Sequence, residues 1–543
     1  MADYAALFTK RAIPALISSY FVRASSGTDR NLAGVYSEVL SGVPAFDGSD
    51  GLILEAGSTD QIRNNSGTGA VAGTPGTRPT NWGLFNPQAM TQNVVGTGVQ
   101  NGIAYTDIRF YGTPGSTGSL ILFLETDTQI VAAAGETWTL SAFMAVVAGS
   151  ISGLANAPKL NMTENTAAGG YVTEGAGSAM SSISSTLERQ ASYTRTLTGG
   201  TTARVKPGLL INIVSGQAFD ITLRIGWPQI EKLPAATSPI PTTSAAVTRA
   251  LAHIGGGTDG IPFSAIGLAA GRTNNIAFHV LVKVPFSSAV AQTGSRTMFS
   301  FRAGTSAEGL AVNLTTTAGR VLLEGTVNGN YVTAIADGLT WAANSWLNIA
   351  GTKSAADGLI IYVNGTAAVN TTANAKAAFS SAITGCNLNS RNSNLDQTAI
   401  GIGVYAGFKI WDGALSDAEL SALSADDLSH VNTFGVAAAP PWGFPSSNLQ
   451  EGDQVYMRKI SGVDGVFTAE ALGFVPAGRS TIEIHAFNAA TQRWLVIRRV
   501  AFFPGKAMKV TRRDILSIYY MTGAKMDIVR AFVMQDGLKK EIF

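Results

Sequence analysis

The chain has 543 residues and a formal net charge of +2; 14% of its residues are charged and 45% are hydrophobic. This length is too great for one hydrophobic core, so about three or four domains are expected. The charged fraction is well below the ~25% of typical globular proteins, and the surface lacks the long-range field that attracts nucleic acid. Neutral glycans and other protein surfaces are the expected partners, although a secreted bacterial β-protein would share this composition.

The sequence offers little for disulfide, zinc or membrane chemistry. Cys386 is the single cysteine, so no disulfide can form within the chain, and we expect a small buried hydrophobe. The four histidines lie far apart and form no pair with ligand spacing. Residues 12–22 lack the features of a signal peptide, and no segment approaches the ~20 apolar residues of a membrane span. Synthesis in a cytoplasm, with release by lysis or assembly, is therefore expected.

Residues 1–60 are expected to form an N-terminal β-rich cap, interrupted by turns at Ser25–Gly27 and Asp47–Gly51. The next stretch, residues 61–235, has the pattern of a two-sheet antiparallel sandwich. Ile121–Glu125 predicts a buried strand, and Gly135–Gly149 alternates apolar and polar residues before it becomes fully apolar. Such strands between Gly-rich turns are typical of a jelly roll. Residues 135–143 also resemble the central strand of carbohydrate-binding jelly rolls, which implies a core position for Trp138.

Two Pro-rich segments, residues 236–249 and 433–447, are predicted to be linkers. Pro234, Pro239 and Pro241 remove backbone donors and fix φ, so neither a helix nor a central strand can continue through the first segment. Its Ser/Thr/Ala composition favours a semi-extended connector on a surface.

Residues 250–432 carry the clearest local signals. Asn364-Gly365 predicts a type I′ turn, because both central residues of that turn need positive φ. Ser416 and Glu419 predict a capping box at the start of a short helix, after a strand that ends at Trp411. Segments 346–365 and 407–423 resemble laminin-G-like, concanavalin-type sandwiches, which implies that fold for this domain. In the first segment the matching positions are Trp346, Ile349, Ala350, Tyr362, Val363, Asn364 and Gly365.

The C-terminal residues 448–543 are predicted to form a small β-rich domain with strands at 455–460, 493–503 and 515–521. From residue 451 onward there are 14 Lys/Arg against 9 Asp/Glu, a local excess of +5. This excess suits either a docking contact with an acidic neighbour or an ordinary solvated surface. The predicted fold class is therefore mainly β: tandem antiparallel β-sandwiches, a jelly roll and then a concanavalin/laminin-G-like domain, followed by this smaller domain.

Several short segments resemble structural proteins of tailed bacteriophages. They are 21–28 (FVRASSGT), 43–46 (VPAF), 51–55 (GLILE), 62–66 (IRNNS) and 79–82 (PTNW). A closing motif follows at Gln229, Glu231, Ala236, Thr237, Ser238, Ile240, Pro241, Thr242, Thr248 and Arg249. The resemblance implies a virion fibre, spike or decoration subunit, made in the host bacterial cytoplasm, that forms a homo-oligomer, as a trimer, and binds other virion proteins.

Binding is better supported than catalysis. The sequence has no GxSxG, HExxH or phosphate-loop motif, and its paired carboxylates lie in turns or on a helical tail rather than at the two sides of a cleft. Aromatic rings beside amides suit sugar recognition at Trp82 with Asn81, at Tyr331 with Asn330, and at Trp341. A core role is the alternative for Trp82 and Trp341. No cofactor is expected, apart from Ca²⁺, which the resemblance to laminin-G-like domains implies at Asn394 and Asp396.

The sequence thus predicts a non-enzymatic virion protein that contacts host surface polysaccharide. Two alternatives remain open at this point. The first is a purely structural capsid or tail component that binds only other virion proteins. The second is a polysaccharide-degrading enzyme that uses its sandwiches as binding modules.

Overall fold

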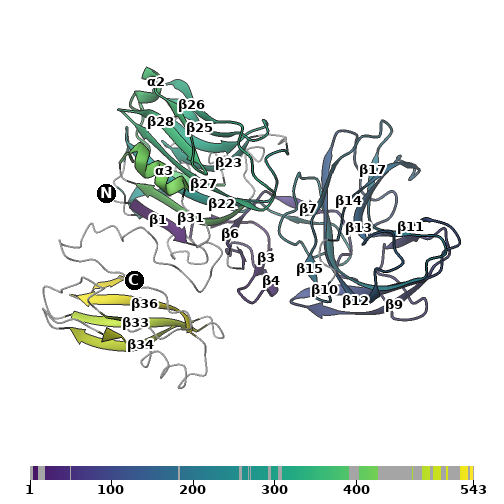
Figure 1. Cartoon of the computed structure of the whole chain (residues 1–543). Helices are drawn as coiled ribbons and strands as arrows, with labels where there is room; N and C mark the ends of the chain where they lie inside the picture. Colours follow the sequence, from purple (N-terminus) through teal and green to yellow (C-terminus); the bar gives the residue numbers. More distant parts are fainter. Residues whose placement is uncertain are drawn as a thin grey trace. The chain divides into compact units, whose positions relative to one another are not determined.

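The computed structural model describes residues 19–425, except 49, 181–183, 256–259, 267, 269–270, 291–294, 304–307, 390–402 and 412. It also gives the backbone of strand β1 (Tyr4–Thr9) and of six strands beyond residue 466. Contacts divide the chain into two compact units, one of them Ala5–Asp426 and the other built mainly from Asp427–Phe543. The described structure is mainly β and almost entirely antiparallel, which confirms the predicted fold class (Figure 1).

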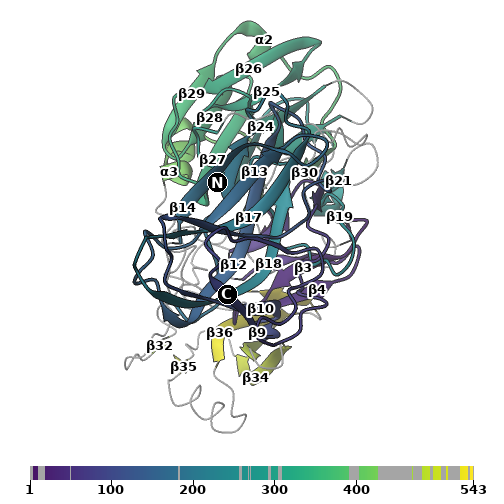
Figure 2. The ribbon, with the colours of Figure 1, turned by 90° about the vertical axis from the view of Figure 1, so that its right-hand side faces the viewer.

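The first sandwich consists of two sheets from the middle of the larger unit. One sheet has the order β15 (Glu188–Arg189), β12 (Thr137–Ser150), β18 (Phe219–Glu231), β10 (Ile103–Gly112) and β9 (Thr91–Gln100), and β16 (Tyr193–Thr196) pairs with β12. The other has the order β14 (Tyr171–Ala179), β13 (Lys159–Asn165), β17 (Arg204–Ile213), β11 (Gly118–Phe123) and β8 (Gly83–Phe85). Figure 2 shows β12 beside β18 and β13 beside β17.

The core of this first sandwich lies between its two sheets. Trp138 is 2% exposed and packs with Leu122, Leu140 and Leu209. Its indole N–H donates to a carboxylate oxygen of Glu136 at 3.1 Å, so the polar edge of the ring is satisfied. The predicted core role of Trp138 is confirmed.

The second sandwich has an eight-stranded and a ten-stranded sheet. The eight-stranded sheet has the order β2 (Phe21–Val22), β20 (His253–Ile254), β30 (Gly385–Leu388), β23 (Arg296–Arg302), β24 (Gly309–Leu314), β25 (Val321–Val327) and β26 (Asn330–Ala336), and β21 (Ile261–Pro262) pairs with β30. The ten-stranded sheet has the order β29 (Thr366–Asn370), β28 (Gly358–Val363), β27 (Ser345–Ser354), β22 (Ile276–Val284), β31 (Gly403–Trp411), β6 (Gly51–Leu54), β5 (Phe46–Asp47), β3 (Gly27–Arg30) and β4 (Tyr36–Val39), and β1 pairs with β31.

Local signals in this second sandwich were predicted correctly. Asn364 and Gly365 have φ of 48° and 81° and form the two-residue turn between β28 and β29. Strand β31 ends at Trp411, and helix α3 (Asp417–Ala425) follows. The backbone N–H of Ser416 donates to the Glu419 carboxylate at 2.8 Å, while Ser416 Oγ accepts from the Glu419 N–H at 3.3 Å. The other helices here are short: η1 (Phe263–Ile266) and α2 (Ala373–Lys376).

The N-terminal segment does not form a separate cap. Strand β6 pairs with β31, with Leu52 opposite Tyr405 and Leu54 opposite Gly403, and β2 pairs with β20. Leu52 and Leu54 are fully buried in the core of the second sandwich. The expected cap of residues 1–60 therefore supplies strands to both sheets of that sandwich, and the first sandwich is an insertion between β6 and β20.

The predicted first linker is also corrected. Residues 236–249 were expected to lie on a surface; Thr237, Ile240 and Thr242 are instead each 3% exposed or less, whereas residues 243–248 are exposed as expected. Burial is tolerated because their polar groups have partners: Thr242 Oγ1 donates to the Ile62 carbonyl at 2.7 Å, and the Ile240 N–H donates to the Gln229 side chain at 2.7 Å. The segment then enters β19 (Val247–Arg249), which pairs with β7 (Ser58–Asp60). The two chain crossings between the sandwiches are thus paired with each other.

The smaller unit contains a four-stranded antiparallel sheet with the order β34 (Arg493–Phe502), β33 (Ser480–Asn488), β36 (Met526–Gln535) and β37 (Leu538–Glu541). Strands β32 (Phe467–Thr468) and β35 (Lys509–Val510) form a further pair. The strand expected at 493–503 is confirmed as β34. The strands expected at 455–460 and 515–521, and the second linker, lie outside the described residues.

Candidate functional site

The structure separates the sequence-predicted binding residues into buried and exposed rings. Trp82 is 7% exposed, and its indole N–H donates to the Asn64 carbonyl at 2.9 Å. Asn81 precedes it with φ of 73°, a backbone position in a turn. Trp341 packs against the core of the second sandwich, and its indole donates to the Phe286 carbonyl at 3.0 Å. Both tryptophans have the structural contacts that their core alternative describes.

Tyr331 lies differently, with 63% of its surface exposed on β26, an edge strand of the eight-stranded sheet. Its hydroxyl donates to Oε2 of Glu324 on the neighbouring strand β25. Asn330, also exposed, precedes it and bonds the Asn328 carbonyl at 2.9 Å, across the turn between β25 and β26. Of the three predicted rings, Tyr331 is the one that presents a face for stacking.

The predicted Ca²⁺ ligands Asn394 and Asp396 lie outside the described residues. Within the part of the chain that the structure describes, no group of three His, Cys, Asp or Glu side chains is placed to hold a metal ion. No helix in that part is both long enough and apolar enough to cross a membrane.

Glu324 is the centre of a polar group on the outward face of the eight-stranded sheet. It is 5% exposed, and its Oε1 accepts from the Asn313 side-chain amide at 2.6 Å, while Oε2 accepts from Tyr331. Asn313 is on β24, so the group spans three adjacent strands. Both carboxylate oxygens are held in place, which fixes the group without help from a ligand.

Strand register places further polar side chains on this same face. Asn387, Ser300, Ala311, Glu324 and Thr333 are successive cross-strand partners. Cross-strand partners in an antiparallel sheet point to the same face, and Phe299 and Val312 in adjacent positions point into the core. Three buried atoms of the face have no hydrogen-bond partner among the described residues: Thr297 Oγ1, Asn313 Oδ1 and Asn387 Nδ2.

The exposed end of this face is partly apolar. Ile335 is 45% exposed and follows Tyr331 on the same face of β26. Val369 is 58% exposed on β29, which contacts β26. Leu322 on β25 pairs with Ile335. We call Asn313, Glu324, Tyr331 and Ile335 the sheet-face site. Its exposed part combines an aromatic ring with an aliphatic edge, and the buried Glu324–Asn313 pair holds the ring hydroxyl; such a platform suits the apolar face of a sugar ring.

A family model described as the concanavalin A-like lectin/glucanases superfamily matches residues 255–421. Residues 255–421 form a concanavalin-like domain. The matched range contains β21 to β31 and the whole sheet-face site, and it does not contain the N-terminal strands of the second sandwich. No curated protein matches the chain.

Solved structures with a likeness to the chain include the following three proteins. The binding domain of botulinum neurotoxin serotype G is 12% identical over 52% of this chain and 58% of its own, with a TM-score of 0.25. The Ruminococcus gnavus IT-sialidase CBM40 bound to α2,3-sialyllactose is 14% identical over 28% of this chain and 84% of its own, with a TM-score of 0.23. A heptameric SAP-like pentraxin from Limulus polyphemus is 14% identical over 29% and 72%, with a TM-score of 0.23. Scores of this size carry no functional argument.

Sequence reasoning found Tyr331 in the concanavalin-like domain and missed its partners. Asn313 and Glu324 each interrupt an otherwise apolar strand, GLAVNL and VLLEGTV. A lone polar residue in such a run is the signal that could have located them, because a buried polar group needs a partner or a function.

Proposed function

We propose that this chain is a non-enzymatic adhesion protein of a bacteriophage or phage-like particle, a fibre, spike or decoration subunit that contacts host surface glycans. The contact is assigned to the sheet-face site of the concanavalin-like domain. The observation that carries the proposal is the exposed ring of Tyr331 beside the Glu324–Asn313 pair.

Each group has a distinct role in this proposal. The Tyr331 ring stacks on the apolar C–H face of a sugar ring, and Ile335 extends that apolar contact. Glu324 and Asn313 are buried and act as positioning residues: Glu324 accepts from the Tyr331 hydroxyl and from the Asn313 amide, which fixes the orientation of the exposed ring. A preset geometry of this kind lowers the entropic cost of binding.

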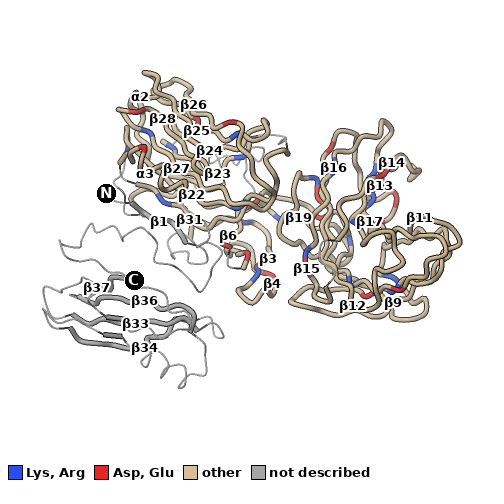
Figure 3. Tube along the Cα trace, in the orientation of Figure 1, with Lys and Arg blue, Asp and Glu red and all other residues tan. Residues whose placement is uncertain are grey.

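The weak charge of the described surface supports a neutral ligand for this site. Figure 3 shows Lys/Arg and Asp/Glu positions interleaved along the larger unit, without a long run of one sign. Such a surface has no extended basic stripe of the kind that tracks a nucleic-acid backbone.

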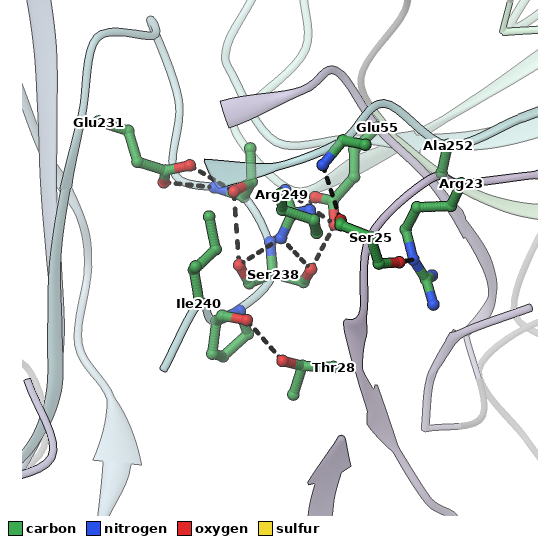
Figure 4. Close-up of polar contacts among 12 residues, drawn as sticks. Arg23, Ser25, Thr28, Glu55, Glu231, Ser238, Ile240, Arg249 and Ala252 are labelled. Carbon is green, nitrogen blue, oxygen red and sulfur yellow. Dashed lines mark hydrogen bonds and ion pairs between the residues drawn. The ribbon is translucent and has the colours of Figure 1, made fainter. Parts of the chain in front are cut away.

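The particle origin rests on the phage-like segments and on where they meet. Glu55 from the N-terminal segments is hydrogen-bonded with Ser238, which also accepts from Arg249 of the closing motif (Figure 4). Beside them, Ser25 accepts from the Ala250 N–H and its carbonyl accepts from Arg23. The segments that carry the resemblance are therefore in contact in the folded structure, although they are far apart in the sequence. It also supports assembly as a homotrimer with other particle proteins as neighbours, which light scattering of the purified chain tests directly.

The absence of a catalytic role is part of the proposal. Glycoside hydrolysis needs two carboxyl groups about 5–10 Å apart on either side of the scissile bond. Glu324 has both oxygens engaged, and Glu308 accepts three backbone N–H groups, from Asn328, Gly329 and Ser380. Shortened chains after incubation with host polysaccharide would overturn this part and favour the degrading enzyme.

The test is binding to purified bacterial capsular and O-chain polysaccharides on a printed array. Wild-type protein is expected to bind a subset of them, and Tyr331→Ala is expected to lose at least tenfold in affinity. Tyr171→Ala is the matched control, because Tyr171 is 66% exposed on the first sandwich. Absence of glycan binding, together with binding to particles that lack the protein, would favour the purely structural component.

A further inference from the structure

A second pocket lies away from the sheet-face site, where the N-terminal strands, the buried segment 236–239 and the concanavalin-like domain meet. Its volume is about 230 Å³. Pockets for drug-sized ligands have volumes of ~300–1,000 Å³, so this smaller pocket suits a ligand with a single ring. Among the residues that line it are Thr28, Tyr36, Arg30, Arg189, Lys283 and Asn344.

Hydrogen bonds hold the walls of the pocket together. Thr28 Oγ1 donates to the Pro239 carbonyl at 2.6 Å, Arg189 Nη2 donates to the Thr237 carbonyl at 2.7 Å, and the Ser238 N–H donates to Glu55 at 2.9 Å. Figure 4 shows Thr28 and Glu55 approaching the same short segment from the N-terminal strands. The pocket is therefore formed before any ligand arrives, which favours affinity.

More cationic than anionic side chains line the pocket. Arg30, Arg189 and Lys283 line it, against Asp47 and Glu55. Arg30 is paired with Asp47 at 3.4 Å, and Lys283 is paired with Asp50 at 2.5 Å.

Glu55 is paired with the buried Arg249 at 3.2 Å, so its charge is already compensated. Arg189 differs from the other two cations, because no carboxylate pairs with it in the described part of the chain.

Arg189 is held in a way that leaves donors available. Its Nη2 bonds both Ser141 Oγ at 2.9 Å and the Thr237 carbonyl, and its guanidinium lies over the Phe143 ring at 5.8 Å. Nε and Nη1 have no hydrogen-bond partner among the described residues. A guanidinium fixed in this way keeps three N–H donors, one on Nε and two on Nη1, and its uncompensated charge suits a carboxylate that accepts a charge-assisted hydrogen bond from either nitrogen.

We propose that this pocket binds one carboxylate-bearing sugar residue of the uronic-acid class, with its carboxylate on Arg189 and its ring hydroxyls toward Thr28 and Asn344. Lys283 lines the same pocket and neutralises Asp50, whose charge would otherwise oppose a bound carboxylate, and the ring of Tyr36 forms an apolar wall. The site is distinct from the sheet-face site. It relies on the proposed function only for the class of ligand, a polysaccharide.

The experiment is calorimetric titration of the full chain with D-glucuronate and, separately, with D-glucose. Saturable glucuronate binding that is at least tenfold tighter than glucose binding is expected. Arg189→Gln is expected to abolish it, and Lys283→Gln is expected to weaken it severalfold. Lys283→Gln leaves the bonds that hold the 236–239 segment intact, so it reports on charge even if Arg189→Gln disturbs that segment.

Two controls separate this site from the sheet-face site. Tyr331→Ala is expected to leave glucuronate affinity unchanged, and Arg109→Gln, which removes an exposed cation of the first sandwich, is expected to do the same. Equal binding of glucose and glucuronate, no saturable glucuronate binding, or unchanged affinity in Lys283→Gln would overturn the proposal. Failure of the sheet-face site alone would leave glucuronate binding intact.

Discussion

The ion pair between Arg249 and Glu55 is predicted to hold the two sandwiches at their junction. The two side chains are 3% and 7% exposed, and their charged atoms are 3.2 Å apart. Arg249 Nη1 also donates to the Ser238 carbonyl at 2.8 Å and to Ser238 Oγ at 2.6 Å. The Ser238 N–H donates in turn to Glu55. The Arg249 side chain thus connects β19 with the buried segment and with Glu55, which follows β6.

Replacing Arg249 with alanine removes the cation that forms the ion pair with Glu55. Loss of one partner from a buried pair costs about 3–5 kcal/mol, because the other charge stays buried and unpaired. At ~2–4 °C per kcal/mol for a domain of 150–250 residues, the unfolding temperature falls by roughly 10 °C. Arg23 lies nearby, and burial together with the positive charge of Arg249 lowers its pKa to about 10. Removing Arg249 also removes its repulsion of Arg23, which offsets a small part of the lost stability.

The assay is differential scanning calorimetry of the full chain at pH 7, followed by limited proteolysis. Arg249→Ala is expected to unfold at lower temperature and to become cleavable between residues 233 and 250. Arg109→Ala breaks an exposed pair with Asp220 and is expected to behave as wild type. The double variant Glu55→Gln/Arg249→Met is expected to recover part of the loss, since it buries no unpaired charge. Wild-type stability and protease resistance in Arg249→Ala would refute the reasoning.

Three further predictions concern stability. His253 is buried, and burial lowers its pKa below 6.5, so on acidification the unfolded chain binds a proton at this histidine before the folded chain does. Stability is therefore full above pH 6.5 and falls as the pH drops below it, and the fall is smaller in His253→Asn. Parallel denaturation profiles of the two proteins between pH 5 and pH 7 would contradict this. Burial lowers the pKa of Lys353 to about 8, so its charge costs stability below pH 8. Lys353→Met is expected to gain about 1–3 kcal/mol of stability there and to gain nothing above pH 10.5. A loss of stability at every pH would show that the hydrogen bond to Asn274 at 2.6 Å outweighs the cost of the buried charge. Gly102 has φ of 78°, and a Cβ there would lie 1.9 Å from the Tyr36 carbonyl oxygen. Gly102→Ala is therefore expected to lower the unfolding temperature. An unchanged unfolding temperature would show that β4 does not pack on this hairpin.

Features encoded within a few residues were predictable from the sequence. The Asn364-Gly365 turn needs only two residues with positive φ, and the Ser416–Glu419 capping box needs only one turn of helix. Trp138 was assigned to the core because residues 135–143 resemble the central strand of carbohydrate-binding jelly rolls. In each case the determining contacts lie close along the chain.

Features that depend on distant pairing were not predictable. Strand β6 has the sequence GLIL, and nothing in four apolar residues specifies β31 as a partner about 350 residues away. The insertion of the first sandwich was therefore missed, and the largely buried stretch 236–242 was taken for part of a surface linker. Its prolines excluded regular structure correctly, but burial depends on the distant partners that satisfy its polar groups.

The candidate site was half predictable for the same reason. Tyr331 was identified as an aromatic residue beside an amide near a turn, and it is exposed. Its working partners Asn313 and Glu324 come from two other strands, and only the strand register brings them together. The same holds for Arg189 and Lys283, which line one pocket although they are far apart in the sequence.

The most direct test of the account is hydrogen-exchange mass spectrometry of the full chain with and without an oligosaccharide selected from the polysaccharide array. Bound ligand is expected to slow amide exchange in peptides that cover 322–335, the strands of the sheet-face site, while peptides from β9 and β10 stay unchanged. Protection confined to the first sandwich, or no protection in 322–335 at saturating ligand, would contradict the claim that this face binds glycan.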